Sequence, residues 1–197
     1  MSVSPGPLPP PAPPRGTLAR WVNLRRKTGP RPAGPPGPWV LLAAWGPCGF
    51  APIAPGTFGT LGAVPLAWAA SYLALPGQLA LATAVTVLGV FAAERAARYW
   101  AVADASPIVI DEVAGYLVTM LAVPFTPGSA LLGFLLFRFY DVVKPWPASR
   151  FDRMKTGLGV MLDDVAAGAY AWITLRLLGA LLARWAGCAA DAWWCSL

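Results

Sequence analysis

The feature that most constrains this chain is a stretch of 62 residues, from Pro32 to Ala93, that contains no Asp, Glu, Lys or Arg. Charged residues make up only 12% of the 197 residues, whereas a typical soluble domain carries about 25%. So few ionised side chains cannot cover a globule of this size in water, and the mean hydropathy is +0.56. We therefore expect a membrane protein whose apolar surface faces lipid.

Apolar runs separated by turn residues predict helices joined in hairpins. Pro76-Gly77 divides a first pair of runs, and Pro124 with Pro127-Gly128 divides a second pair. The runs are Leu61–Leu75, Gln78–Ala93, the two halves of Val113–Phe137, and Val165–Ala183. The expected fold class is all-α, a compact multi-helix bundle embedded in a membrane. Several runs are shorter than the roughly 17 to 25 residues of a full span, so they are tilted, extended by flanking residues, or buried without crossing.

The N-terminal segment differs from the rest of the chain. Residues 1–38 hold 12 of the 22 prolines, which predicts a disordered, partly polyproline arm before a helical domain at residues 39–197. Six Lys or Arg and no acid occur in the first 31 residues. Attraction to anionic lipid headgroups explains this charge, and no nucleic-acid reader module accompanies it. Leu18–Lys27 is either a short amphipathic turn on the membrane or part of a solvated tail.

The distribution of basic residues predicts the orientation. If the arm is cytoplasmic, both links between hairpins return to the same side, and 13 of the 15 Lys and Arg residues lie on that face. The two opposite turns carry none, in agreement with the positive-inside rule. We expect nearly every acid to lie on the cytoplasmic face of the membrane.

The absence of histidine excludes serine triads, histidine phosphatases and histidine zinc sites. Cys48, Cys188 and Cys195 lack metal-ligand spacing, and no Cys-x5-Arg phosphatase loop is present. We interpret the cysteines as small apolar or surface thiols. Chemistry in this chain must come from carboxylates, hydroxyls, lysine, arginine or a metal.

Two acidic doublets, Asp111-Glu112 and Asp163-Asp164, precede apolar runs at the face that holds most of the charge. Each doublet alone is explained by helix capping. Together with Asp141 they favour a magnesium site, because hard divalent cations prefer carboxylate oxygens. Asp141 also shares a helix face with Arg138, so a local ion pair is the alternative for that residue.

Several neighbouring residues could bind an anion. Lys144 precedes Pro145 and therefore indicates a helix end, while Arg138, Lys144, Arg153 and Lys155 supply positive charge. The glycine-rich segments Gly46–Thr60 and Gly157–Gly159 allow close approach of backbone N–H groups, but neither is a P-loop. Thr57 and Thr60 either bind phosphate or cap a helix.

Five motifs, in order and with matching spacing, resemble the phosphatidylglycerophosphatase A family over roughly Trp39 to Leu182. They are APIAPGTFGTLGAVP (51–65), IDEVAG (110–115), FRFYDVVKPWP (137–147), FDR (151–153) and GLGVMLDDVAAG (157–168). The resemblance implies an all-α, magnesium-dependent integral membrane lipid phosphatase, located in the bacterial inner (cytoplasmic) membrane with its active face cytoplasmic. Its expected reaction removes the terminal phosphomonoester of phosphatidylglycerophosphate and yields phosphatidylglycerol and phosphate, a step of phospholipid biosynthesis.

Matched motif by motif, the resemblance assigns the catalytic acids as Asp111, Glu112, Asp141, Asp163 and Asp164, and the anion-binding bases as Arg138, Lys144 and Arg153. Our hypothesis is that the five acids hold one or two Mg²⁺ ions. One carboxylate then serves as a base or as a covalent nucleophile, and both routes remain open.

Three other functions fit the sequence less well. A CDP-alcohol phosphotransferase requires the pattern Asp-Gly-x2-Ala-Arg-x8-Gly-x3-Asp-x3-Asp, which is absent. An ion channel or transporter with an acidic cytoplasmic vestibule would place its charges along a path across the membrane, whereas Arg176 is the only charge inside an expected span. A scaffold protein has no need of paired acidic doublets.

Overall fold

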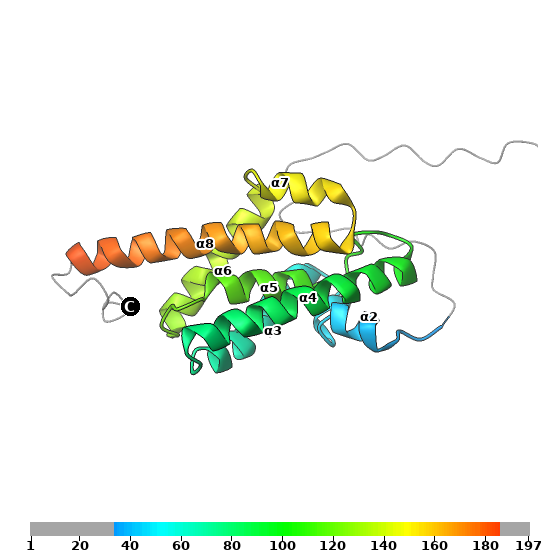
Figure 1. The fold of residues 1–197 in the computed structure, drawn as a ribbon, viewed down its shortest axis with the longest axis horizontal. Helices are drawn as coiled ribbons and strands as arrows, with labels where there is room; N and C mark the ends of the chain where they lie inside the picture. Colours follow the sequence, from blue (N-terminus) through cyan, green and yellow to red (C-terminus); the bar gives the residue numbers. More distant parts are fainter. Residues whose placement is uncertain (1–33, 186–197) are drawn as a thin grey trace, which may run out of the picture.

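The computed structural model describes residues 34–185, and within this range every regular element is helical. The elements are α2 (Pro38–Ala43), η1 (Cys48–Phe50), α3 (Pro55–Ala70), α4 (Leu75–Trp100), α5 (Ile110–Thr119), α6 (Pro127–Val143), α7 (Ala148–Phe151), η2 (Asp152–Met154) and α8 (Gly157–Trp185). Figure 1 shows them as one helical bundle. The prediction of an all-α fold is confirmed. Residues 1–33 of the expected arm, including the Leu18–Lys27 segment, and Cys188 and Cys195 lie outside the described residues.

Local sequence explains where the helices begin. Proline occupies the first turn of α2, α3, α4 and α6, where its missing N–H has no helical partner to lose. At the start of α6, the side chains of Thr126 and Ser129 form a reciprocal capping box. The turn expected at Pro76-Gly77 lies slightly earlier, at residues 71–74, because these two residues fit the first turn of α4. α6 ends at Val143, as the Lys144-Pro145 pair predicts.

The short helix α5 is the centre of the bundle. Its side chains are mostly buried, among them Val113, Tyr116 and Leu117. α5 packs chiefly against α8, and also against α3 and α4, whereas the consecutive helices α3 and α4 hardly contact one another. The predicted order of helices is correct, but the two expected hairpins are not packed as pairs. α3 packs mainly on the central α5, α4 on α5 and α8, and α6 mainly on α8, whereas the short α2 packs on α4.

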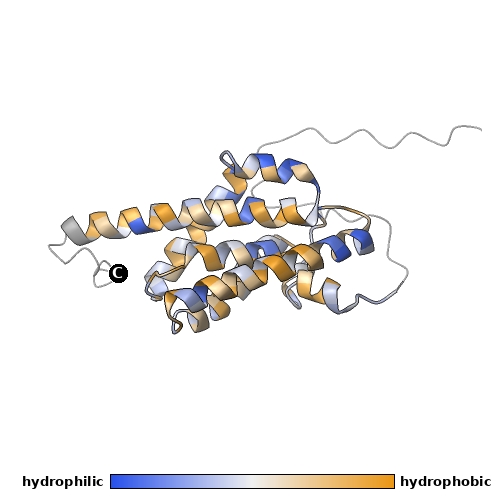
Figure 2. Ribbon diagram, viewed as in Figure 1, coloured by the Kyte–Doolittle hydropathy of each residue, from blue (hydrophilic) through white to orange (hydrophobic). Residues whose placement is uncertain are grey.

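Two helices, α4 and α8, are long and apolar enough to cross a membrane. Most of each is not covered by protein, and exposed apolar side chains such as Leu88 and Leu177 follow their length. α5 has only ten residues, fewer than a span requires, and is buried in the bundle. In Figure 2 the hydrophilic residues gather on α7 and at the C-terminal end of α4, whereas the long helices are mainly hydrophobic.

Particular helix ends contribute the residues at the charged end of the bundle. The N-terminal ends of α3, α5 and α8 and the C-terminal end of α6 contribute residues that contact one another there. At the other end, polar groups join the α5–α6 loop to its neighbours. Gln78 Oε1 accepts from the N–H of Ala122 at 2.8 Å, Trp172 Nε1 donates to the Leu121 carbonyl at 2.7 Å, and Arg176 donates to the Ala122 carbonyl at 3.0 Å.

Candidate active site

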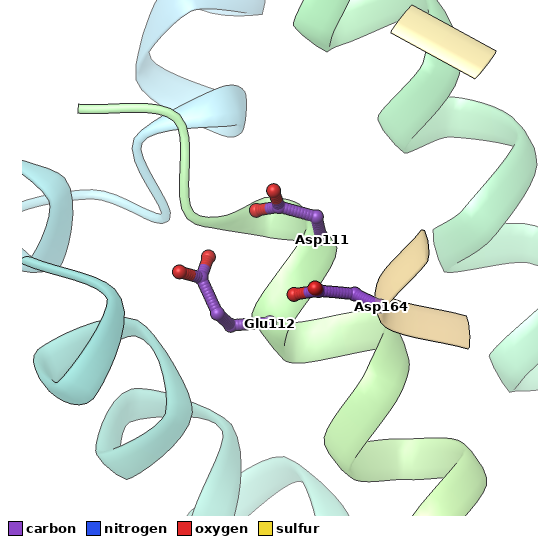
Figure 3. Close-up of side chains that lie close together, drawn as sticks. All are labelled: Asp111, Glu112 and Asp164. Carbon is purple, nitrogen blue, oxygen red and sulfur yellow. The ribbon is translucent and has the colours of Figure 1, made fainter. Parts of the chain in front are cut away.

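Three carboxylates converge between α5 and α8. Asp111 and Glu112 lie in the first turn of α5, and Asp164 extends from α8 toward them (Figure 3). One oxygen from each can be chosen so that all three lie within 4.8 Å of one another. We call Asp111, Glu112 and Asp164 the acidic cluster. A group of three oxygen ligands at this spacing could hold a divalent metal ion.

The acidic cluster lacks the donors that its oxygens need. Asp111 Oδ1 and Glu112 Oε2 are buried and, among the described residues, receive no hydrogen bond. Burial above all, with the neighbouring Glu112 and Asp164 carboxylates, raises the pKa of Asp111 well above its ordinary value. Burial also raises the pKa of Glu112, although Asp111 and Arg138 act in the opposite direction. A bound cation would satisfy these oxygens and favour the ionised form, so the residues present fit a metal.

Arg138 on α6 lies beside the acidic cluster. Its Nη1 is 2.6 Å from Asp141 Oδ2 and 3.7 Å from Glu112 Oε1. The ion pair with Asp141, predicted as the alternative to metal binding, is therefore present, and through Glu112 the arginine also borders the acidic cluster. Asp141 is held one helical turn from Arg138 and is largely buried.

The second acid of the α8 doublet has a different environment. Asp163 accepts a hydrogen bond from Lys144 Nζ, which also donates to Asp152 Oδ1 at 3.0 Å. We call Lys144, Asp152 and Asp163 the lysine cluster. Burial lowers the pKa of a lysine, but the Asp164 and Asp163 carboxylates outweigh this and raise the pKa of Lys144. The ammonium group is therefore charged at neutral pH.

The capping interpretation does not hold for the second doublet. α8 begins at Gly157, so Asp163 and Asp164 are its seventh and eighth residues, well inside the helix. Asp111 and Glu112 do lie in the first turn of α5, where the helix dipole favours negative charge, but Val109 is the N-cap. Helix capping therefore cannot explain both doublets.

Glycines determine how closely the site elements approach. A Cβ on Gly56, in the first turn of α3, would lie 2.1 Å from Glu112 Oε1 and 3.1 Å from Arg138 Nη1. A Cβ on Gly168 of α8 would lie 2.3 Å from the carbonyl oxygen of Gly115 on α5. Asp111 lies four residues before Gly115, and Asp164 lies four residues before Gly168. The close approach of these two glycines therefore brings the carboxylates of α5 and α8 together.

The remaining predicted site residues are placed less centrally. Arg153, on η2, is exposed and donates to the Ser149 carbonyl at 3.1 Å. Thr60 is fully buried and its hydroxyl donates to the Gly56 carbonyl at 2.9 Å, whereas Thr57 is half-buried in the first turn of α3.

Three features of the site were missed by the sequence reasoning. Asp152, in the middle of the FDR motif, has no role in the sequence prediction but contacts Lys144 in the structure. Gly56 lies within a glycine-rich segment that was interpreted for anion binding, whereas its small size is needed beside Glu112 and Arg138. Gly157 likewise packs against Val90 and Glu94 of α4, where a Cβ would lie 2.6 Å from the Val90 carbonyl oxygen.

Comparison with known proteins gives a consistent result. A model of the family described as Phosphatidylglycerophosphatase A matches residues 41–179. Phosphatidylglycerophosphatase A of Escherichia coli (strain K12) is 37% identical over 146 residues, which cover 72% of this chain and 84% of the relative. The Haemophilus influenzae protein of the same name is 34% identical over 141 residues, 70% of this chain and 86% of the relative.

A further relative carries a different name. A Bacteroides thetaiotaomicron protein, named provisionally as a phosphatidylinositol-3-phosphatase, is 37% identical over 155 residues, which cover 74% of this chain and 93% of the relative. No solved structure matches the chain.

Proposed function

The chain belongs to the phosphatidylglycerophosphatase A family, and on that premise we propose that it hydrolyses the terminal phosphomonoester of phosphatidylglycerophosphate. The products are phosphatidylglycerol and phosphate, and the step belongs to phospholipid biosynthesis. The observation that carries this proposal is the convergence of Asp111, Glu112 and Asp164, with two unsatisfied buried oxygens, beside Arg138. This arrangement suits a dianionic phosphate approached together with a divalent cation.

Magnesium is the proposed cofactor. Asp111, Glu112 and Asp164 are its most direct ligands, with Asp141 and Asp163 as the two further acids that the family motifs assign to the site. When bound, Mg²⁺ would polarise the phosphomonoester and lower the pKa of a coordinated water. The absence of histidine in this chain is consistent with an oxygen-only ligand set.

The basic side chains have the task of binding the phosphate. Arg138 and Lys144 are both charged and partly buried at the acidic end of the bundle, so they can balance the charge on the equatorial oxygens. Arg153 and the hydroxyl groups of Thr57 and Thr60 are the further candidates. A monoester carries up to two negative charges and a diester one, so this cationic set favours the monoester.

A carboxylate of the site completes the chemistry. It either takes the proton of a water that attacks phosphorus, or it attacks phosphorus itself and forms an acyl phosphate. In both routes the P–O ester bond breaks and the departing oxygen takes up a proton to give phosphatidylglycerol, and in the second route water then hydrolyses the acyl phosphate to release phosphate. Trapping with a fluorophosphate analogue distinguishes the two routes, because only the covalent route leaves a carboxylate-bound adduct.

The proposed location is the bacterial inner membrane, with the acidic end of the bundle at the cytoplasmic surface. Two observations support it: α4 and α8 are suited to cross a membrane, and the basic residues of the chain are concentrated on one side of the expected spans. The lipid headgroup then lies at the level of the acidic cluster.

The test is phosphate release by the purified full-length protein, with and without Mg²⁺. The panel contains phosphatidylglycerophosphate, phosphatidate, lysophosphatidate and phosphatidylinositol-3-phosphate. We expect Mg²⁺-dependent release with phosphatidylglycerophosphate as the preferred substrate. Glu94→Gln is the matched control, since Glu94 is an acid outside both clusters. No release from any lipid, together with ion flux in liposomes, would overturn the proposal in favour of a channel.

A further inference from the structure

An open apolar groove lies on the surface formed by α4, α5 and α8. Its volume is about 230 Å³. The lining includes Leu79, Thr83 and Val87 of α4, Val118 of α5, Leu121 of the α5–α6 loop, and Val165 of α8. No charged residue lines it. The groove is separate from the carboxylates described above, and no step of the proposed reaction uses it.

One residue of the groove lining is the chain neighbour of an acid of the acidic cluster. Val165 directly follows Asp164 in α8, and Val118 lies seven residues after Asp111, on the same side of α5 two turns farther along. On α4, Gly89 packs against Ile110 and Met161, which lie close in the chain to the carboxylates of the acidic cluster. From there the groove continues over Val87 to Leu79, a distance of about 12 Å along the helix axis.

The chemistry of the lining suits hydrocarbon. Thr86 also borders the groove, but its hydroxyl donates to the Ala82 carbonyl at 2.8 Å within α4. The groove runs along α4 and is bordered by α8, the two helices that are long and apolar enough to cross a membrane. A molecule in it would therefore have its polar end at the acidic cluster and its apolar part at membrane depth.

We propose that the groove binds an acyl chain of the substrate lipid, so that the tail positions the phosphate at the acidic cluster. This inference rests on the proposed function, because it requires a lipid phosphate as substrate. A water-sized group takes about 30 Å³ of liquid, so the volume holds roughly seven or eight methylene groups. The groove thus accommodates part of one chain.

A bulky side chain in the groove tests the proposal by kinetics. Thr83→Trp obstructs part of the groove, and Ala84→Trp, at the next position of α4, which is also exposed but lies outside the groove, is the matched control. Both are assayed on phosphatidylglycerophosphate with C16 or C4 chains in mixed micelles at equal surface concentration. We expect Thr83→Trp to raise KM for the C16 lipid about tenfold, the effect of losing roughly two buried methylenes. KM for the C4 lipid and both values for the control stay unchanged.

Equal effects of the two tryptophans, or equal effects on both chain lengths, would overturn the acyl-chain site. If wild-type protein releases phosphate from neither lipid, it is the proposed function that fails. The acyl-chain site is then tested by measuring lipid binding in place of kinetics.

The binding measurement uses wild-type protein, so it does not depend on the folding of a variant. Phosphatidate with a diazirine in the middle of one acyl chain is photoactivated in micelles, and labelled residues are mapped by mass spectrometry. We expect labels at residues 79–87, 118–121 and 165, reduced by unlabelled lipid phosphate. Equal labelling of the exposed Leu131 and Leu135 on α6 would show that bulk lipid alone reaches the groove, and the absence of label at residues 79–87 would show that no acyl chain occupies it.

Discussion

Asp163 and Asp164 are neighbours on one helix, yet the acidic cluster and the lysine cluster are opposite in character. In the lysine cluster the Asp163 carboxylate contacts the ammonium group of Lys144. In the acidic cluster Asp164 faces two further carboxylates, two of whose oxygens have no donor. A helical step of one residue turns a side chain by about 100°, so one doublet can supply both a ligand and a counter-charge. The acidic cluster could therefore hold a cation from outside, whereas the lysine cluster contains its own cation.

The largest expected effect separates the two aspartates. We expect Asp164→Asn to lower kcat/KM by about 10³-fold and to abolish stabilisation by Mg²⁺, because it removes a ligand oxygen from the acidic cluster. Asp163→Asn should cost only about tenfold and retain the Mg²⁺ response, since Lys144 keeps Asp152 as a partner. Phosphate release and thermal unfolding with increasing Mg²⁺ measure both. Equal loss of the Mg²⁺ response in the two variants would contradict the division into two clusters.

Removal of the lysine cation is expected to act through stability. Lys144→Met leaves Asp163, whose side chain is only 6% exposed, without its ammonium partner, and should lower the free energy of unfolding by about 3 kcal/mol. Thermal or denaturant unfolding in detergent measures this loss. Adding Asp163→Asn to the same chain should recover part of it, since the unpaired charge is then gone. A double variant no more stable than Lys144→Met would show that the unpaired charge of Asp163 does not cause the loss of stability.

The next effect concerns the distance between the two helices that carry the acids. Gly168→Ala should separate α5 from α8, because its Cβ would lie 2.3 Å from the Gly115 carbonyl oxygen. We expect a loss of about 2 kcal/mol in stability and weaker Mg²⁺ binding. Ala169→Gly, at the next position of α8, is the control for a change in helix propensity. Unaltered Mg²⁺ binding in Gly168→Ala would indicate that the helix spacing does not set the ligand geometry.

The smallest effect is expected at the rim of the lysine cluster. Asp152 is 38% exposed and 3.0 Å from Lys144 Nζ. Because solvent screens such a pair, Asp152→Asn should cost less than about 1 kcal/mol and lower activity by less than about fivefold. A loss comparable to that of Lys144→Met would show that Asp152 holds the lysine in place more strongly than its exposure suggests.

The sequence predicts the helical elements and the clustering of charged residues well. The positions of proline and glycine and the scarcity of charged residues are local properties of the sequence. It does not predict which helix packs on which. α3 buries its face on α5 rather than on α4, since complementary surfaces, not chain order, decide contacts. The same limit applies inside the site. The sequence does not distinguish Asp163 from Asp164, and only the structure shows that Asp163 contacts Lys144 whereas Asp164 lies near Glu112.

The hydrogen bonds from α8 to the α5–α6 loop have a consequence for the synthesis and folding of this chain. Arg176 and Trp172 of α8 donate to backbone carbonyls of the α5–α6 loop, and the same helix supplies Asp163 and Asp164 at the opposite end. α8 is also the last described helix to leave the ribosome. A nascent chain that has not reached residue 164 therefore lacks part of both clusters and leaves this loop without two donors. Docking of α8 therefore supplies both the two donors to the loop and the aspartates of the candidate site.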